Sequence, residues 1–168
     1  MGIQKRFTKY KGRMKKPNKK IKLENKAKIR RRLFRLWSQK VLESNGNICA
    51  VTGAKRGNIV NGKPVILDAH HLFDKWLFPA LRYDVLGGIA LCKSAHKFGL
   101  GAHKSPLWFA LWMQEHRPKQ FAYAMSHYND PIDLDNRDVL YAIEAKLKSA
   151  SLTSEELDIL GIAKCSPE

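Results

Sequence analysis

Leu67-Asp68-Ala69-His70-His71, a short apolar run that ends in two adjacent histidines, is the stretch that decides the fold. The run is typical of a β-strand, in which side chains alternate, so Asp68 and His70 are expected on one face. His71 stands at the exit of the strand, where the chain can turn its ring toward the same face. Since paired imidazoles rarely serve a hydrophobic core, the stretch predicts a strand that supplies chemical groups to a site.

Two more histidines lie close behind this strand, so four of the six histidines of the chain fall within 34 positions. Residues 87–91 are predicted as a second strand, and residues 93–98 as the start of a short helix that carries His96. His103 follows a glycine-rich turn, residues 99–102, which can fold back on the helix. Neutral imidazoles are the commonest ligands of transition metals. The spacing favours a metal site, but it leaves a structural ion open beside a catalytic one and does not assign a general base.

The positive charge of the chain is concentrated at its N-terminal end. Residues 1–40 hold 17 of the 31 lysines and arginines and only one acidic residue, Glu24, while the other residues balance to zero. Such a segment indicates an arm for a polyanion, with nucleic acid as the first choice, and a solvated basic face is the plainer alternative. The residues expected to contact phosphate are Lys15, Lys16, Lys19, Lys20, Lys28, Arg31, Arg32 and Arg35.

The length of 168 residues and the hydrophobic content of 44% suit one domain with a tail. We expect residues 1–22 to be a disordered basic arm and residues 23–45 a basic amphipathic helix. Residues 46–117 are expected to form the core that carries the histidines. Residues 118–168 are expected to be helices packed on that core.

Turn-forming residues divide the rest of the chain into short elements. Residues 48–51 and 64–70 are predicted strands, and residues 72–86 a loop with one helical turn. Ser105-Pro106 opens a helix whose inner face is expected to hold Leu107, Trp108, Leu111 and Trp112. Further helices are marked by Pro118 before Phe121, Met125 and Tyr128, by Asp135 as the cap of a helix to Ser149, and by a capping box of Thr153 and Glu156.

Three widely spaced cysteines, Cys49, Cys92 and Cys165, do not suit a disulfide framework. Thr52 and Ala95 stand where a zinc knuckle would place its second thiolates, which excludes a four-cysteine structural zinc. The sequence has no apolar stretch long enough to span a bilayer and no secretory signal. A mitochondrial transit peptide is the less favoured alternative for the basic N-terminus, because residues 1–28 are rich in lysine and contain no serine. We therefore expect the protein to stay in the compartment where it is made, the cytoplasm, and we expect a monomer.

Three stretches together resemble the HNH endonucleases and their ββα-metal finger. They are Cys49-Ala50-Val51-Thr52-Gly53, Leu67-Asp68-Ala69-His70-His71-Leu72 and Gly88-Ile89-Ala90-Leu91-Cys92-Lys93-Ser94-Ala95-His96. The stretch His103-Lys104-Ser105-Pro106-Leu107-Trp108-Phe109 is similar to the continuation in phage-type and homing-type members. The resemblance covers about residues 45–117 and implies an α+β fold, in which the finger is embedded in a mainly helical domain with a basic N-terminal arm.

The resemblance also implies a role for each residue that matches the family pattern. His71 matches the general base that deprotonates the attacking water, and Asp68 matches the acidic residue that binds or orients the metal. The matched ligands of one divalent ion are His70, His96 and His103. Three imidazoles suit Zn, Ni, Co or Mn, whereas an oxygen from Asp68 and a substrate phosphate would suit Mg or Mn.

The chain departs from the family at Gly87, nine residues before His96, where members usually carry asparagine. That asparagine pins the loop of the finger through its side chain, while a main-chain carbonyl at this point can orient the base. Glycine keeps the carbonyl, so we include Gly87 among the catalytic positions. It loses the pin, which leaves a weakened or inactive enzyme as an alternative.

The main hypothesis is a metal-dependent DNA endonuclease of the HNH type that acts on double-stranded DNA, in homing, phage DNA processing or restriction. The first alternative is a nucleic-acid-binding protein that does not cut and retains a degenerate finger. The second is a small metalloprotein whose histidines close a structural site. Metal-dependent cleavage by the purified protein separates the three.

Overall fold

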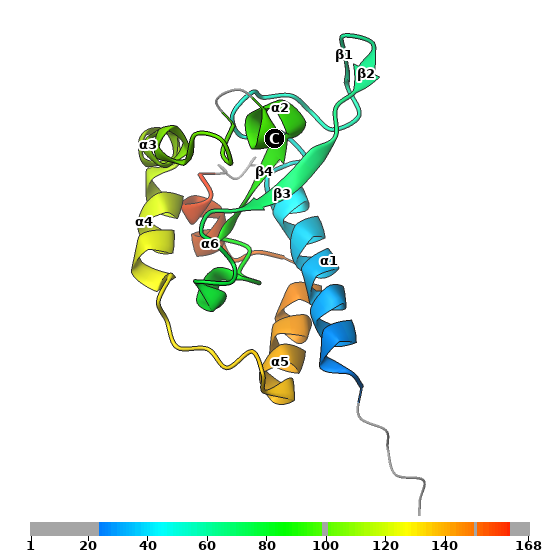
Figure 1. Cartoon of the computed structure of the whole chain (residues 1–168), viewed down its shortest axis with the longest axis vertical. Coiled ribbons are helices and arrows are strands. Elements are labelled where there is room, and N and C mark those ends of the chain that lie inside the picture. The colour runs from blue at the N-terminus through cyan, green and yellow to red at the C-terminus, as the bar shows by residue number, and fades with distance from the viewer. Residues whose placement is uncertain (1–23, 99–100, 150, 162–168) are drawn as a thin grey trace, which may run out of the picture.

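The computed structural model describes residues 24–98, 101–149 and 151–161 (Figure 1). Over these residues the chain combines helices with two small antiparallel sheets, which is an α+β arrangement. Several expectations lie outside the described residues, namely the basic arm 1–22 with Lys15, Lys16, Lys19 and Lys20, and Cys165.

The centre of the fold is the antiparallel pair of β3, Leu67–His71, and β4, Gly88–Cys92, followed directly by helix α2, Lys93–Lys97 (Figure 1). The register places His71 opposite Gly88. All of β4 is buried, which explains why its sequence is apolar without polar alternation. The predicted second strand and short helix are confirmed, with ends that differ by one residue.

The predicted strand over residues 48–51 is wrong. Ile48 makes only an isolated bridge to Lys55 in the described chain, and the backbone turns at Gly53, whose φ is +70°. Cys49, Ala50 and Val51 are instead packed as an irregular layer, in which the Ala50 N–H donates to the Ala90 carbonyl of β4, while Ile48 is exposed.

The predicted strand from Pro64 is divided in two. Pro64 belongs to an exposed hairpin of β1, Ile59–Val60, and β2, Lys63–Pro64, whereas β3 begins only at Leu67. The turn of the hairpin has positive φ at both central residues, Asn61 and Gly62, as two-residue hairpin turns require. The loop predicted after β3 contains one 3-10 turn, η1, Pro79–Leu81.

Helix α1, Lys26–Ser44, packs against β3, β4 and α5, Arg137–Lys148 (Figure 1). Gly46, with φ of +65°, lies just beyond its end, as expected of a terminating glycine. Its buried face recurs every three to four positions, so the predicted amphipathic helix is confirmed over the described residues. This face consists of Ile29, Leu33, Trp37, Val41 and Leu42, with Leu36 partly buried.

Helices α3, Pro106–His116, and α4, Pro118–His127, lie on the other side of the β3–β4 pair from α1 (Figure 1). The inner face predicted for α3 is wrong, because Leu107 and Leu111 are 74% and 58% exposed. Apolar residues surround most of α3, so its periodicity did not distinguish one face. The buried residues of α3 are Phe109 and Met113, Trp108 and Trp112 are partly buried, and Met125 of α4 is exposed.

The last two helices are α5 and α6, Ser154–Ile159. Asn136, not the predicted Asp135, caps α5, because the Asn136 side chain accepts a hydrogen bond from the Asp138 N–H. Asp135 instead accepts from Arg30 of α1. The predicted capping box before α6 is confirmed.

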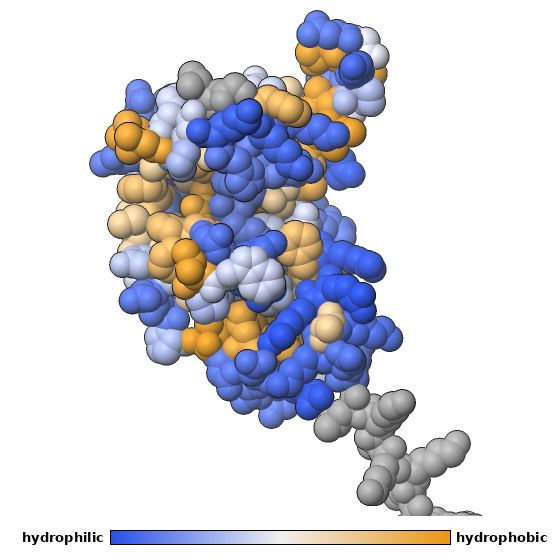
Figure 2. All heavy atoms as spheres, viewed as in Figure 1, coloured by the Kyte–Doolittle hydropathy of each residue, from blue (hydrophilic) through white to orange (hydrophobic). Residues whose placement is uncertain are grey.

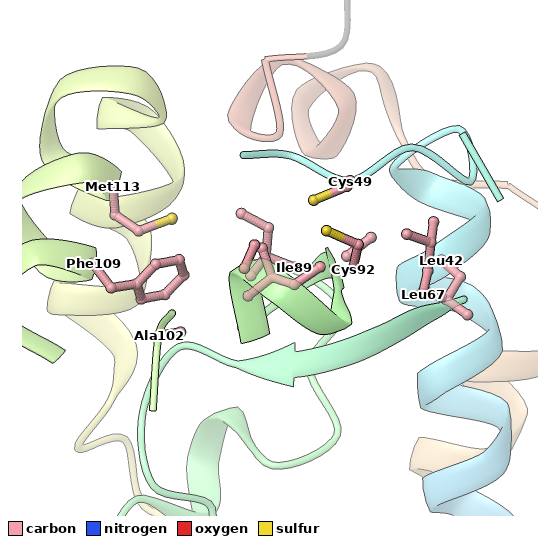
Figure 3. Packing of buried hydrophobic residues seen from close by; sticks show 11 residues of the cluster. Leu42, Cys49, Leu67, Ile89, Cys92, Ala102, Phe109 and Met113 are labelled. Carbon is pink, nitrogen blue, oxygen red and sulfur yellow. The ribbon is translucent and has the colours of Figure 1, made fainter. Parts of the chain in front are cut away.

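Cys49 and Cys92 are buried free thiols in the core cluster between the β3–β4 pair, α1 and α3. Their sulfur atoms point toward one another in Figure 3. The Thr52 hydroxyl lies 3.5 Å from the Cys92 sulfur, so a weak polar contact stands where a second thiolate would be needed for zinc. Packing therefore holds this layer together, as predicted.

The surface in Figure 2 is mainly hydrophilic over α1 and α5, whereas apolar residues gather over α3 and α4. None of the described helices combines the length and the apolar character that crossing a bilayer requires.

Candidate metal centre

Three histidines from separate elements converge at one point: His70 from β3, His96 from α2, and His103 from the turn after α2. One ring nitrogen of each lies within 4.8 Å of the others, and the Nε2 atoms of His96 and His103 are 3.0 Å apart. Two nitrogen ligands of one tetrahedral zinc ion stand about 3.3 Å apart. The donor set and its spacing therefore fit one shared divalent ion.

Asp68 holds one of these rings in place. Its Oδ2 accepts a hydrogen bond from Nδ1 of His96 at 3.0 Å. Because a carboxylate accepts, the proton of His96 is assigned to Nδ1, and the lone pair of Nε2 faces His103. Asp68 thus orients a ligand, and it lies outside the group of three atoms that could share the ion.

The turn that carries His103 is folded onto the end of α2. The N–H groups of Ala102 and His103 donate to the carbonyls of Ala95 and His96. This approach requires glycine at position 101, where a Cβ would lie 2.9 Å from the Phe98 carbonyl oxygen. The expected fold-back of the turn is confirmed in the described residues.

His71 lies beside this cluster with its ring held on two sides. Its Nε2 lies 3.0 Å from the carbonyl oxygen of Arg82, and its ring stacks on Trp37 with centroids 3.8 Å apart. A carbonyl can only accept, so Nε2 carries the proton and Nδ1 keeps its lone pair. Trp37 is fixed in turn, because its Nε1 donates to the Asp84 carbonyl.

Burial keeps the rings of His70, His71 and His103 neutral near pH 7. It lowers the pKa of His70 to about 3, helped by the neighbouring imidazoles, and it is also the main cause of the lowered pKa of His103. Burial lowers the pKa of His71 to about 4. The hydrogen bond to the Arg82 carbonyl acts against this shift, and the positive charges of Lys75 and Arg82 add to it. Neutral imidazole is the form that binds a cation or accepts a proton.

Gly87 does not contact His71 in the way its position predicted. Its carbonyl accepts from the Leu72 N–H at 3.0 Å, so the carbonyl of Arg82 orients the ring instead. A Cβ at position 87 would lie 2.9 Å from the Cβ of Leu81 and 3.0 Å from its oxygen. The packing of η1 therefore leaves no room for an asparagine side chain.

Gln120 of α4, which the sequence did not single out, pins the loop that an asparagine at position 87 was expected to pin. Its Nε2 donates to the carbonyls of Leu86 and Gly88, at 3.0 and 2.8 Å, on either side of Gly87. The side chain is completely buried. In the sequence, Gln120 is only a polar residue four positions before Ala124. This spacing does not distinguish a buried glutamine from one on the surface.

All four histidines line one cavity of about 560 Å³. Its other walls come from α1, α3, α4 and the loop after β3, and they are largely aromatic or flexible apolar. These wall residues are Phe34, Phe73, Phe109, Met113, Phe121 and Met125. The arrangement can hold a cation at three nitrogens and offer a fourth imidazole as a proton acceptor within the same space.

The predicted phosphate contacts on α1 separate into two groups. Arg32 is bound within the fold, because it donates to the carboxylates of Glu24 and Glu144, so we remove it from the proposed contacts. Lys28 faces solvent and pairs only loosely with Glu24. Arg31 and Arg35 are exposed.

Comparisons of the chain with models of protein families, with curated proteins and with solved structures found no match. A function for this chain therefore has to be argued from the chemistry and geometry of the four histidines.

Proposed function

We propose that the protein is a metal-dependent DNA endonuclease of the HNH type. The observation that carries the proposal is the joint placement of His70, His96 and His103 around one point and of His71 in the same cavity. The order of the elements supports it, because β3 with His70 and His71, the antiparallel β4 and α2 with His96 follow one another as in the ββα-metal finger, and His103 lies in the next turn.

His71 is the proposed general base. In hydrolysis, its Nδ1 takes a proton from water, the water oxygen forms a bond to phosphorus, and the bond from phosphorus to the 3′ oxygen breaks. The Arg82 carbonyl and the Trp37 ring hold the imidazole in one orientation and one tautomer. Such positioning lowers the entropic cost of bringing the base and the water together.

The three other histidines are the proposed metal ligands, and Asp68 keeps His96 oriented toward the ion. A bound divalent ion would supply Lewis acidity toward the phosphate oxygens and the departing 3′ oxygen. The identity of the ion is proposed from the donor set: Zn, Ni, Co or Mn suit three imidazoles, and Mg or Mn would depend on oxygen ligands from the substrate.

Nucleic acid is the proposed partner because of the charge distribution. Arg31 and Arg35 stand exposed on α1, beside Phe34, which lines the cavity of the histidines. The lysine-rich segment before α1 lies outside the described residues and adds to the same charge in the sequence. Contacts of this kind bind phosphate without reading bases, so affinity is expected to fall steeply with salt.

The test is nicking of supercoiled plasmid by the full-length protein during titration with Mg, Mn, Ni, Co and Zn ions. We expect His71→Ala to lower the rate by about 100-fold or more, the range of general base catalysis. The variant should still bind the metal in a calorimetric titration, because its ligands are intact. His116→Ala is the control, since His116 lies on α3 outside the cluster.

An unchanged rate in His71→Ala would remove the proposed base. Tight, salt-sensitive DNA binding without cleavage under any of the metals would favour the non-catalytic alternative. Unfolding by a chelator, without DNA binding, would favour a structural metal site.

A further inference from the structure

Trp76 and the adjacent Leu77 expose large apolar side chains on the loop after His71. Trp76 is 69% exposed and Leu77 is 74% exposed. Exposed tryptophan is uncommon unless it serves a contact, because its ring is among the largest apolar surfaces a residue can hide. Neither side chain belongs to a core cluster of the described residues.

The loop is built to hold these residues outward. One oxygen of the Asp74 carboxylate accepts from the N–H groups of Trp76 and Leu77, at 2.8 and 3.1 Å. Such a turn fixes the local backbone without burying the side chains that follow. The two residues are therefore presented on an ordered turn and not on a loose end.

Cations lie against the aromatic rings of this loop and of the neighbouring α1. The guanidinium carbon of Arg82 lies 4.2 Å from the centre of the Trp76 ring, and Lys75 Nζ lies 4.9 Å from the ring of Phe34. The carboxylates of the segment, Asp74 and Asp84, are engaged in hydrogen bonds within the fold. The charge that this surface offers to a partner is therefore positive.

The same Arg82 connects this loop to the proposed reaction centre. Its guanidinium covers Trp76, while its carbonyl contacts His71. Trp76 and His71 therefore both contact the same arginine residue. A nucleic-acid strand rises about 3.4 Å for each stacked nucleotide, so a base at Trp76 would belong to a nucleotide only a few positions from a phosphate at His71.

We propose that Trp76, backed by Arg82 and flanked by Leu77, stacks on a nucleobase that has left its own stack, in a single strand or at an opened position of a duplex. The proposal rests on the proposed function, because it assumes that nucleic acid occupies the site. A largely exposed ring with the cations of Arg82 and Lys75 near it suits any base, so the contact adds affinity without reading sequence.

The experiment measures binding of the full-length protein to a fluorescein-labelled single-stranded oligonucleotide of mixed sequence, in EDTA so that no cleavage occurs. Trp76→Ala is expected to bind about 5-fold to about 150-fold more weakly, the range found for loss of one stacking contact. Trp76→Phe should retain most of the affinity. Because no charge is removed, the dependence of affinity on salt should stay unchanged in both variants.

Leu77→Ala and Leu111→Ala form a matched pair, because both remove an exposed leucine and only Leu77 belongs to the loop. We expect weaker binding from the first and wild-type binding from the second, with little change in thermal unfolding for either. A duplex of the same sequence should lose less affinity than the single strand in Trp76→Ala.

Three outcomes would overturn the proposal. If the wild-type protein binds the oligonucleotide and Trp76→Ala binds it equally well, the stacking contact is absent while the proposed function stands. Losses as large on the fully paired duplex as on the single strand would also overturn the proposal, because a paired base must first be opened, at an energetic cost, before it can stack on Trp76. If the wild-type protein binds neither, the proposed function fails and the stacking contact fails with it.

Discussion

At the scale of single residues, hydrogen bonds with one possible donor assign the proton of each critical ring. Asp68 and the Arg82 carbonyl are acceptors, so His96 and His71 each donate from a defined nitrogen. The opposite nitrogen of each ring then keeps its lone pair, which in His96 faces His103, a proposed metal ligand, and in His71 is the proposed proton acceptor. These two hydrogen bonds therefore distinguish His96, a proposed metal ligand, from His71, the proposed general base.

Removal of the Asp68 carboxylate tests this assignment. We expect Asp68→Ala to weaken binding of Zn or Mn by about 10-fold to about 100-fold, because an unsupported ligand ring loses its orientation. Calorimetric titration at pH 7 measures the change. The side chain is about one-third exposed, so the fold should be retained.

Asp130→Ala is the control for this variant. It removes an equivalent contact between a carboxylate and a histidine, Asp130 with His127, at a distance from the cluster. A loss of metal affinity in the control, or its absence in Asp68→Ala, would contradict the orienting role.

At the scale of elements, close approach of the backbone decides whether the site forms. The turn after α2 reaches the carbonyls of that helix only because position 101 has no side chain. The start of β4 lies similarly close to α1, where a Cβ on Gly88 would lie 2.7 Å from the ring of Trp37. Both glycines therefore act through packing, without special backbone angles.

Gly101→Ala should separate His103 from the other two ligands. The added Cβ would meet the carbonyl oxygens of Phe98 and Ala95 at 2.9 and 3.1 Å, so the turn has to shift, at a cost of about 1 to 3 kcal/mol. We expect a smaller rise in melting temperature on addition of Zn than for the wild-type protein. Lys104→Ala, in the same turn, is the control, and equal rises in Gly101→Ala and wild type would show that the turn accommodates the methyl group.

At the scale of the whole molecule, α1 and α5 are joined by a buried carboxylate although they are far apart in the sequence. Glu144 of α5 accepts from Arg32 of α1 at 2.7 and 2.9 Å and also pairs with Lys148. This network, with the apolar face of α1, connects α5 to the β3–β4 pair, in which β3 carries His70 and His71. An arginine expected to bind phosphate is thereby part of the fold.

The network predicts how stability depends on pH. The hydrogen bond from Arg32, followed by that from Lys148, lowers the pKa of Glu144 from 4.5 to about 2. Because the folded-state pKa is the lower one, Glu144 stabilises the fold above the unfolded pKa, and this contribution is lost as the pH falls from about 4.5 toward about 2. Glu144→Gln should lower the free energy of unfolding at pH 7 by about 1.5 to 3 kcal/mol.

Urea denaturation at a series of pH values checks this prediction. Glu144→Gln should also show a weaker dependence on pH in the acid range than the wild-type protein. Asp158→Asn, which disrupts an exposed pair with Lys119, is the control and should change stability by less than about 1 kcal/mol. Equal effects of the two substitutions would contradict a special role for the buried carboxylate.

The sequence by itself determined the local elements that rest on short-range patterns. The strand with its paired histidines, the helix that carries His96 and the capping box before α6 follow from alternation and turn chemistry, which act over a few residues. The spacing of the histidines favoured a metal site, and the resemblance to the HNH finger implied His70, His96 and His103 as its ligands, which the structure brings together.

Only the tertiary structure decided which distant groups support the site. Gln120 and the Arg82 carbonyl hold the loop and the ring, Leu81 excludes a side chain at position 87, and Glu144 takes Arg32 away from solvent. The inner face of α3 was decided in the same way. These contacts join residues far apart along the chain, and their energies depend on packing at particular distances, which no local pattern of residue types records.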